Sequence, residues 1–226
     1  MNARLASIAF AAAVLVPTPG WAQGADAVQY KPPANDLAPR RVGGNARGIP
    51  ETMPAVAVLA PDHLALTVSE RPTLYWYLSR PTAARIELVV VDPRDARPVV
   101  EAVVPGDRAG IQAFSLAERG VRLEPGVAYE WSVAVVADPA QRSRDVVAGG
   151  AVQRVEPSAT LRSRLAASSE GERAAVLAGE GIWYDALAAL SEPIAARPGD
   201  ANLRARRAAV LEQAGLADVA AFERRN

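Results

Sequence analysis

Apolar residues recur at every second position along two stretches in the middle of the chain. Ile86, Leu88 and Val90 form one such set, and residues 129–135 repeat the pattern. Because side chains alternate between the two faces of a strand, each set belongs to one face of a β-strand. Other short segments rich in Val, Ile, Leu, Tyr and Trp are separated by Pro, Gly and Asp, which favour turns. The pattern predicts strands near 64–68, 73–79, 85–91, 98–104, 110–116, 128–137 and 146–155.

About seven short strands are typical of a two-sheet sandwich. In LEPGVAYEW, Leu123 precedes a Pro-Gly turn and Tyr129 opens the next strand. This arrangement is similar to the tyrosine corner of immunoglobulin-like and fibronectin type III sandwiches, in which the phenol bonds to upstream backbone. We therefore expect an immunoglobulin/fibronectin III-like β-sandwich over residues 55–157, with Trp76, Tyr129 and Trp131 in its core.

The periodicity becomes helical after Pro157, and alanine becomes the dominant residue. The pentapeptide RAAVL occurs at 173–177 and again at 207–211, an offset of 34, and the same offset relates Gly181 to Gly215. A period of 34 residues is that of the tetratricopeptide repeat, in which each unit is a pair of helices. The sequence therefore predicts a tetratricopeptide-like helical hairpin after the sandwich.

The residues of the stretch GIWYDALAAL match positions of this repeat that pack between helices, so we do not interpret the stretch as a catalytic pocket. Trp183 takes the aromatic position after the turn, and Ala186 takes the small position at which helices touch. Both are expected in the core of residues 158–226. Pro193 departs from the repeat pattern, and a proline inside a helix costs about 3 kcal/mol. We therefore expect a kink or an early end of the helix near Ser191.

The second repeat is incomplete, and helical repeats need about three stacked copies to bury a continuous core. The helical part is therefore expected to lean on the sandwich or on a partner protein. An open end of such a stack offers an apolar surface. The candidate protein-binding surface consists of Leu203, Leu211, Leu216 and Phe222.

The pattern of residues 1–22 is typical of an export signal. An apolar run at 5–16 is too short to span a bilayer, and the small residues Gly20 and Ala22 suit cleavage before Gln23. No later segment approaches spanning length, so the mature chain is expected to have no membrane span. We expect a periplasmic or secreted protein.

Residues 23–54 are rich in Pro, Gly, Ala and Asn and show no apolar period, which is typical of an extended or disordered leader. The pair Gly43-Gly44 lacks the following Gly-Lys-Ser/Thr and the strand-then-helix context of a phosphate loop. No nucleotide site is expected there.

The charge balance and the lack of cysteine exclude several classes of function. The 25 Lys and Arg residues balance 25 Asp and Glu residues, so no net field attracts nucleic acid or an anionic membrane. Lys31 is the one lysine, which fits codon bias in a GC-rich genome better than phosphate recognition, since the arginines are scattered among acids. With no cysteine, the chain has no disulfide, no thiol nucleophile and no thiolate metal site.

Groups suited to catalysis are few. His63, in the loop PDHL, is the only histidine, and no GxSxG motif or calcium-loop spacing accompanies it. The acids Asp92 and Asp138 start Asp-Pro turns, where the carboxylate caps local amides. Arg142 and Asp145 form either an exposed binding loop or a surface ion pair, which is the plainer interpretation. We predict no metal and no cofactor.

Three segments together, RPTLYWYLSRP, LEPGVAYEWSVAVVADPAQRSRDV and GIWYDALAAL, resemble a bacterial envelope family called "domain of unknown function 928". The resemblance runs from about Arg40 to Gly215 and implies the same architecture and export, with no established activity. It also implies two cysteines in many relatives, at the places held here by Ile49 and Ala137. If those cysteines pair, the leader around Ile49 packs near Ala137.

The sequence therefore favours an exported, non-enzymatic binding or scaffolding protein whose partner is an unknown envelope or secreted protein. The alternative is a carbohydrate-binding sandwich, which requires Tyr75, Tyr77 or Trp131 at the surface. A third hypothesis, an enzyme centred on His63, has the least support.

Overall fold

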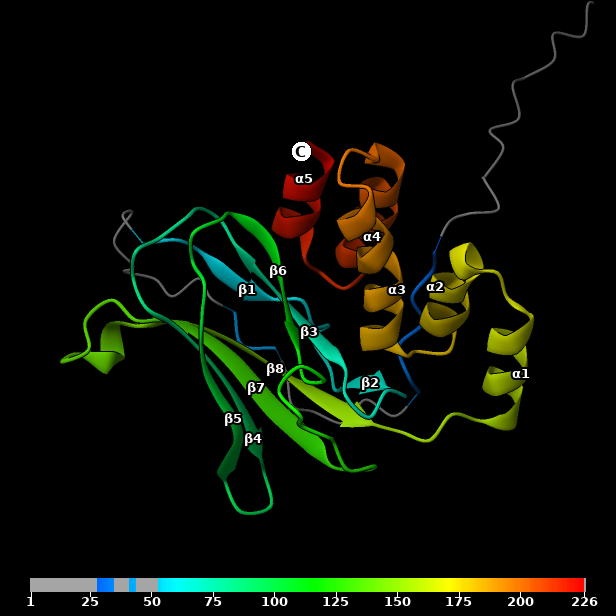
Figure 1. Ribbon diagram of the computed structural model, residues 1–226, viewed down its shortest axis with the longest axis horizontal. Helices are drawn as coiled ribbons and strands as arrows, with labels where there is room; N and C mark the ends of the chain where they lie inside the picture. The colour runs from blue at the N-terminus through cyan, green and yellow to red at the C-terminus, as the bar shows by residue number, and fades with distance from the viewer. Residues whose placement is uncertain (1–27, 35–40, 44–52, 226) are drawn as a thin grey trace, which may run out of the picture.

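A computed structural model describes residues 28–34, 41–43 and 53–225 (Figure 1). Within them, a β-rich part is followed by a helical part, as predicted. The strands are β1 (Val56–Val58), β2 (Ala65–Thr67), β3 (Thr73–Leu78), β4 (Ile86–Asp92), β5 (Arg97–Val104), β6 (Gly110–Ser115), β7 (Ala128–Val135) and β8 (Val146–Arg154). The α-helices are α1 (Ala159–Ala167), α2 (Glu170–Gly179), α3 (Trp183–Ala196), α4 (Ala201–Gln213) and α5 (Ala217–Arg225), and a 3₁₀ turn, η1, spans Arg142–Arg144.

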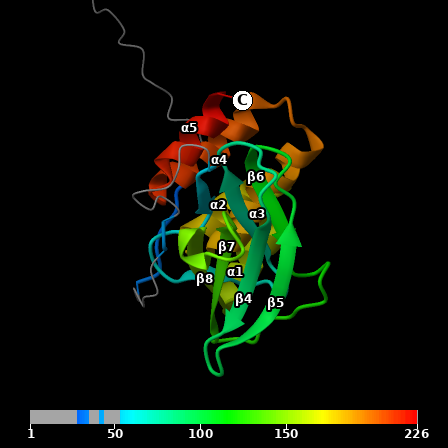
Figure 2. The ribbon, with the colours of Figure 1, turned by 90° about the vertical axis from the view of Figure 1, so that its left-hand side faces the viewer.

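The strands form two sheets, with the orders β1-β3-β6 and β2-β8-β7-β4-β5. All seven predicted strands are present, with ends within two residues of the prediction. The short strand β1 was not predicted. Figures 1 and 2 show the long hairpin of β4 and β5 reaching away from the helices, which lie beside the smaller sheet and β2.

The alternation that predicted the strands also sorts their side chains. Along β4 and β7, buried residues alternate with more exposed ones, and the buried set includes Leu88, Val90, Val133 and Trp131. These side chains join those of β1 and β3 in one apolar cluster, because each sheet hides its hydrophobic face against another element. The core therefore lies between the sheets and continues under the helices.

The predicted bond of Tyr129 is present. The Glu124 backbone N–H donates to the Tyr129 hydroxyl over 3.2 Å, and Tyr129 is buried. A buried phenol needs such a partner. The contact ties the turn before β7 to the strand itself.

The repeated sequence forms repeated structure. Helices α2 and α4 are each followed, two residues after their last residue, by a glycine with left-handed backbone, Gly181 at φ +75° and Gly215 at φ +72°. In each, the residue after the glycine donates to a carbonyl five residues back over 2.9 Å: Ile182 to Leu177 and Leu216 to Leu211. This is the Schellman arrangement, which satisfies the free carbonyls of a helix end. The 34-residue offset thus relates two helical hairpins, α2–α3 and α4–α5.

The two glycines differ in their surroundings, which gives a matched pair of variants. Alanine at either position costs about 1–2 kcal/mol for the left-handed backbone. At Gly181 the new Cβ would also lie 3.0 Å from the Lys31 carbonyl oxygen, whereas at Gly215 the nearest atom is a flexible Arg41 nitrogen at 3.5 Å. We therefore expect Gly181→Ala to lower the free energy of unfolding more than Gly215→Ala does. Urea unfolding of both variants measures this, and equal losses would contradict the close contact with Lys31.

Pro193 does not end its helix. Helix α3 continues to Ala196, so the expectation of an early stop near Ser191 is wrong. The proline stands in the last turn of a 14-residue helix whose other side chains are largely buried. Because tertiary packing supplies most helical stability, it offsets the local cost of the proline.

The described part of the predicted leader packs on the rest of the molecule. Val28 and Tyr30 are buried, and the Lys31 N–H donates to the Ala178 carbonyl over 3.0 Å. Val42 forms an antiparallel bridge with Gly149 in β8. Each of these stretches is held to the rest of the molecule by backbone hydrogen bonds.

Candidate functional site

The aromatic residues of GIWYDALAAL join the helices to the sheets. The Trp183 indole N–H donates to the Leu59 carbonyl over 2.8 Å. The Trp131 indole N–H donates to the Tyr184 hydroxyl over 2.8 Å, and that hydroxyl donates to the Ala151 carbonyl over 2.9 Å. Burial raises the pKa of the Tyr184 phenol, which keeps it protonated. The side chains of Trp183 and Tyr184 are therefore part of the core, as the sequence indicated, and Ala186 is fully buried in the same helix.

The rings required for a carbohydrate platform are interior. Tyr75, Tyr77 and Trp131 expose 5%, 8% and 2% of their surface. Tyr77 packs edge-on against Phe222, with ring centroids 5.2 Å apart. An aromatic platform must present its ring face to the ligand. These three side chains therefore cannot form one.

His63 is held by the leader. Its Nδ1 lies 3.0 Å from the Leu64 carbonyl oxygen, and its Nε2 lies 3.2 Å from the Tyr30 hydroxyl. The carbonyl only accepts, so Nδ1 carries the proton and Nε2 accepts from Tyr30. The Tyr30 ring stacks on the imidazole at 5.8 Å. Both ring nitrogens are thus engaged, and the contact of Nε2 with Tyr30 helps to hold residues 28–34 in place.

The acids near strand ends behave as turn residues. The Asp92 carboxylate accepts from the Arg94 N–H over 3.0 Å, and the Asp138 carboxylate accepts from the Ala140 N–H over 2.9 Å. This is the capping chemistry that the sequence predicted. Arg142 pairs with Asp145 at 2.7 Å, so the plainer interpretation, an ion pair, agrees with the structure.

The C-terminal apolar residues do not form one exposed surface. Leu211 and Leu216 are 0% and 6% exposed, so that part of the expectation is corrected. Leu203 and Phe222 are half-buried, and the Phe222 ring lies over Gly110 of β6. The reason is that α5 folds back onto the smaller sheet and covers the end of the repeat. The proposed neighbour of Ala137, Ile49, lies outside the described residues.

A polar groove lies between α2, α3 and the turn before β3, with a volume of about 590 Å³. At its base, the Asp185 carboxylate accepts from the Thr67 hydroxyl over 2.7 Å and from the Val68 N–H over 3.1 Å. Burial raises the pKa of Asp185, and these hydrogen bonds oppose the rise. Since its oxygens already serve β2, Asp185 acts as a tie between helix and sheet.

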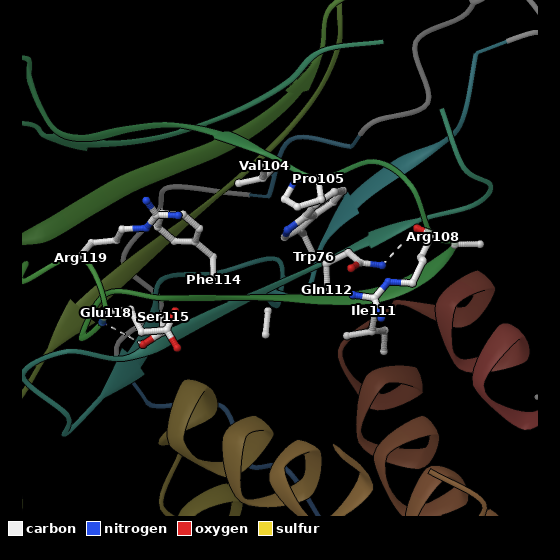
Figure 3. Close-up of a pocket in the computed structure, with 12 residues that line it drawn as sticks. Trp76, Val104, Pro105, Arg108, Ile111, Gln112, Phe114, Ser115, Glu118 and Arg119 are labelled. Carbon is white, nitrogen blue, oxygen red and sulfur yellow. Dashed lines mark hydrogen bonds between the residues drawn. The ribbon is translucent and has the colours of Figure 1, made fainter. Parts of the chain in front are cut away.

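A second hollow, the Trp76 cavity, opens between the edges of the two sheets, beside β6 and the end of β5. Its volume is about 440 Å³. The deep wall consists of Trp76, Val104 and Phe114, which are 1%, 7% and 4% exposed. Figure 3 shows Trp76 and Phe114 on the same side of β6, facing Val104 and Pro105. The deep wall of the cavity is therefore aromatic and apolar, and the rest of its lining includes the polar side chains of Gln112 and Ser115.

The indole N–H of Trp76 is the unusual polar group of this cavity. Among the described residues it has no hydrogen-bond partner, unlike the indoles of Trp131 and Trp183. Its nitrogen is turned toward the space between Pro105 and Phe114 (Figure 3). The N–H is not among the fully buried unpaired atoms of the described residues, so it is open to the cavity. An indole N–H can only donate, so it is a candidate group for binding an acceptor that enters the cavity.

Charged side chains stand at both ends of the cavity. Arg108 is at one end, and its guanidinium makes no ion pair within the described residues. At the other end, the Arg119 guanidinium lies 5.1 Å from the centroid of the Phe114 ring, next to Glu118 (Figure 3). The arrangement suits an apolar group with a hydrogen-bond acceptor and an acidic flank.

Sequence reasoning assigned Trp76 to the core and missed this site. Trp76 is indeed buried, but the cavity depends on the distance between two sheet edges that are formed by separate strands. The local signal was limited to GDRAGIQAFSLAERG, in which arginines flank the β6 pattern on both sides.

The described part of the chain contains no candidate membrane span and no candidate metal cluster. Every helix in the described part of the chain is too short or too polar to cross a lipid bilayer. No three His, Asp or Glu side chains of the described ranges gather as metal ligands would.

Comparison with known proteins identifies the family. A search of curated proteins gives no match. A family model described as "Domain of Unknown Function (DUF928)" matches residues 42–223, which include every strand and nearly all of the helical part. The chain therefore belongs to the DUF928 family.

Proposed function

We propose that the protein is a non-enzymatic binding protein of the bacterial cell envelope that holds part of a partner protein in the Trp76 cavity. Export is supported by the signal-like pattern of residues 1–22. The non-enzymatic part is supported by His63, whose two ring nitrogens are already engaged. The binding part rests on the cavity.

The observation that carries the proposal is the indole N–H of Trp76, which lies on the apolar wall of the cavity and has no hydrogen-bond partner among the described residues. Such a donor can bond to an acceptor that enters the cavity, and the bond is stronger where the wall around it is apolar. Peptide carbonyls are the acceptors that proteins supply most often. An apolar side chain next to a carbonyl therefore matches the cavity.

Indole resonances test the proposal directly. The full chain has four tryptophans, and Trp76→Phe assigns the Trp76 correlation in a ¹⁵N–¹H spectrum. Adding N-acetyl-leucine N-methylamide should shift the Trp76 indole correlation. It should leave those of Trp131 and Trp183 in place, because both are bonded inside the protein.

Two different results would contradict the binding of a protein partner in the Trp76 cavity. If the leucine derivative shifts no indole signal at millimolar concentration, the Trp76 cavity is not a binding site for such groups. If cellobiose shifts the Trp76 signal and the leucine derivative does not, the ligand is a carbohydrate and the proposal of a protein partner fails.

A further inference from the structure

The strand next to the Trp76 cavity has an open edge. β6 is the last strand of its sheet, paired with β3 on one side. The Leu116 N–H donates to the Pro72 carbonyl across this pair over 3.1 Å. Because backbone groups alternate in direction along an antiparallel strand, Gly110, Gln112 and Phe114 also face β3.

The backbone groups of Ile111, Ala113 and Ser115 consequently point away from the sheet. None of their N–H or C=O groups has a hydrogen-bond partner in the described ranges. Their spacing, every second residue, is the one that an added strand requires.

The other edges are protected or short. β1 and β2 have three residues each. The free edge of β5 carries Pro98, charged residues and a register shift opposite Val90 and Val91, all of which hinder pairing with another chain. β6 has the sequence GIQAFS, with no proline and no charge, and its ladder with β3 is regular. Among the described strands, β6 is therefore the edge best suited to accept a partner.

We propose that an extended segment of a partner protein adds to the free edge of β6 as a further strand, inserting an apolar side chain beside Trp76 and placing acidic side chains against Arg108 and Arg119. This inference rests on the proposed function and names its ligand. Side chains of an added strand alternate between the faces of the sheet, so every second one enters the Trp76 cavity. The guanidinium of Arg108, which has no ion-pair partner in the described ranges, selects an acidic flank.

A short synthetic peptide tests the added strand. The probe is acetyl-Glu-Gln-Leu-Thr-Leu-Thr-Leu-Gln-Glu-amide, in which the three leucines and the two terminal glutamates lie on the same face of an extended strand. We expect its binding to slow hydrogen exchange at Ile111, Ala113 and Ser115, and to shift the Trp76 indole signal. The amides of Gln112 and Phe114 are already paired with β3 and should change little.

Methylated versions of the peptide separate strand addition from simple insertion. One version is N-methylated at the three leucines and the other at the two threonines. In an extended strand only alternate N–H groups face the neighbour. One version should therefore lose binding by at least about tenfold, and the other should retain it. Loss in both or in neither overturns the added strand.

Protein variants give a matched control. Ala113→Pro removes an outward N–H without touching the ladder with β3, because proline is tolerated on an edge when its missing N–H faces solvent. We expect it to weaken peptide binding about tenfold, whereas Ala113→Thr should bind as the parent does. Arg108→Glu should weaken the glutamate peptide and improve a version with lysine at both ends.

Binding in the Trp76 cavity and addition of a strand to β6 would be contradicted by different results. If the leucine derivative still shifts the Trp76 indole but Ala113→Pro binds the peptide normally, the cavity is a binding site and strand addition is wrong. If no probe shifts the indole, both fail. If Ile111, Ala113 and Ser115 become protected with rising protein concentration and no peptide, the occupant is a second copy of this chain.

Discussion

Trp183→Ala is expected to lower the free energy of unfolding by about 3–5 kcal/mol, the cost of truncating a large buried aromatic side chain. The Trp183 ring is fully buried between α3 and the loop after β1, and its N–H bonds to the Leu59 carbonyl. Its ring also meets that of Tyr30 edge-on at 4.9 Å. Truncation therefore weakens the contact of the helices with both the sheets and the leader at once.

Chemical denaturation of Trp183→Ala and Trp183→Phe separates packing from hydrogen bonding. Trp183→Phe keeps most of the ring but leaves the Leu59 carbonyl without this donor, for a loss of about 1–3 kcal/mol. Far-ultraviolet circular dichroism and the fluorescence of the remaining tryptophans should report one shared transition. An earlier, separate melting of the helices would show that Trp183 does not couple the two parts.

Glu223→Ala is expected to lower the free energy of unfolding by a similar amount, about 3–5 kcal/mol, because it leaves a buried arginine without its counter-ion. The Arg207 guanidinium contacts the Glu223 carboxylate at 2.5 Å, and the two residues are 7% and 5% exposed. Arg207 also donates to the Ser191 hydroxyl over 3.1 Å. This cluster joins α3, α4 and α5.

The double variant Arg207→Met with Glu223→Leu is the control. It removes both charges together, so no buried ion remains unpaired, and such replacements are often neutral or stabilising. We expect urea unfolding to show the double variant clearly more stable than Glu223→Ala. If the two are equally unstable, the cluster contributes packing rather than charge pairing.

The strands were predictable because alternation is a local property. Residues 86–92 and 128–135 carry the period of two in their own sequence, and both form strands over almost the predicted range. β1, Val56–Val58, was missed, although β2 is equally short and was predicted. Of the two expectations for Pro193, a kink or an early end of the helix, the early end was wrong, because the cost of the proline is local while the packing that opposes it comes from other elements.

The internal repeat of the sequence predicted only part of the helical structure. The offset of 34 predicted two equivalent turns, and Gly181 and Gly215 have nearly the same backbone angle. It did not predict that α5 turns back onto β6, since that contact depends on the shape of the smaller sheet. Leu211 and Leu216 were therefore expected at a surface and lie inside.

The candidate site was the least predictable part. Burial of Trp76 followed from its strand pattern, but an unpaired N–H can be recognised only when all neighbours are placed. The open edge of β6 likewise depends on strand order, and strand order is not a property of any single segment.

Contacts between the first and last parts of the described chain shape how the protein folds. The Tyr30 N–H donates to the Gln213 side chain across a separation of 183 residues, and Arg41 donates to the Ala214 carbonyl across 173. At about 5–20 residues per second, a ribosome needs roughly 10–40 s to make the stretch between Tyr30 and Gln213. Contacts of such long sequence separation form late, because a long loop must close first, and residues 28–34 cannot take their final place until the last helices have emerged. Completion of the native structure therefore has to follow synthesis instead of accompanying it.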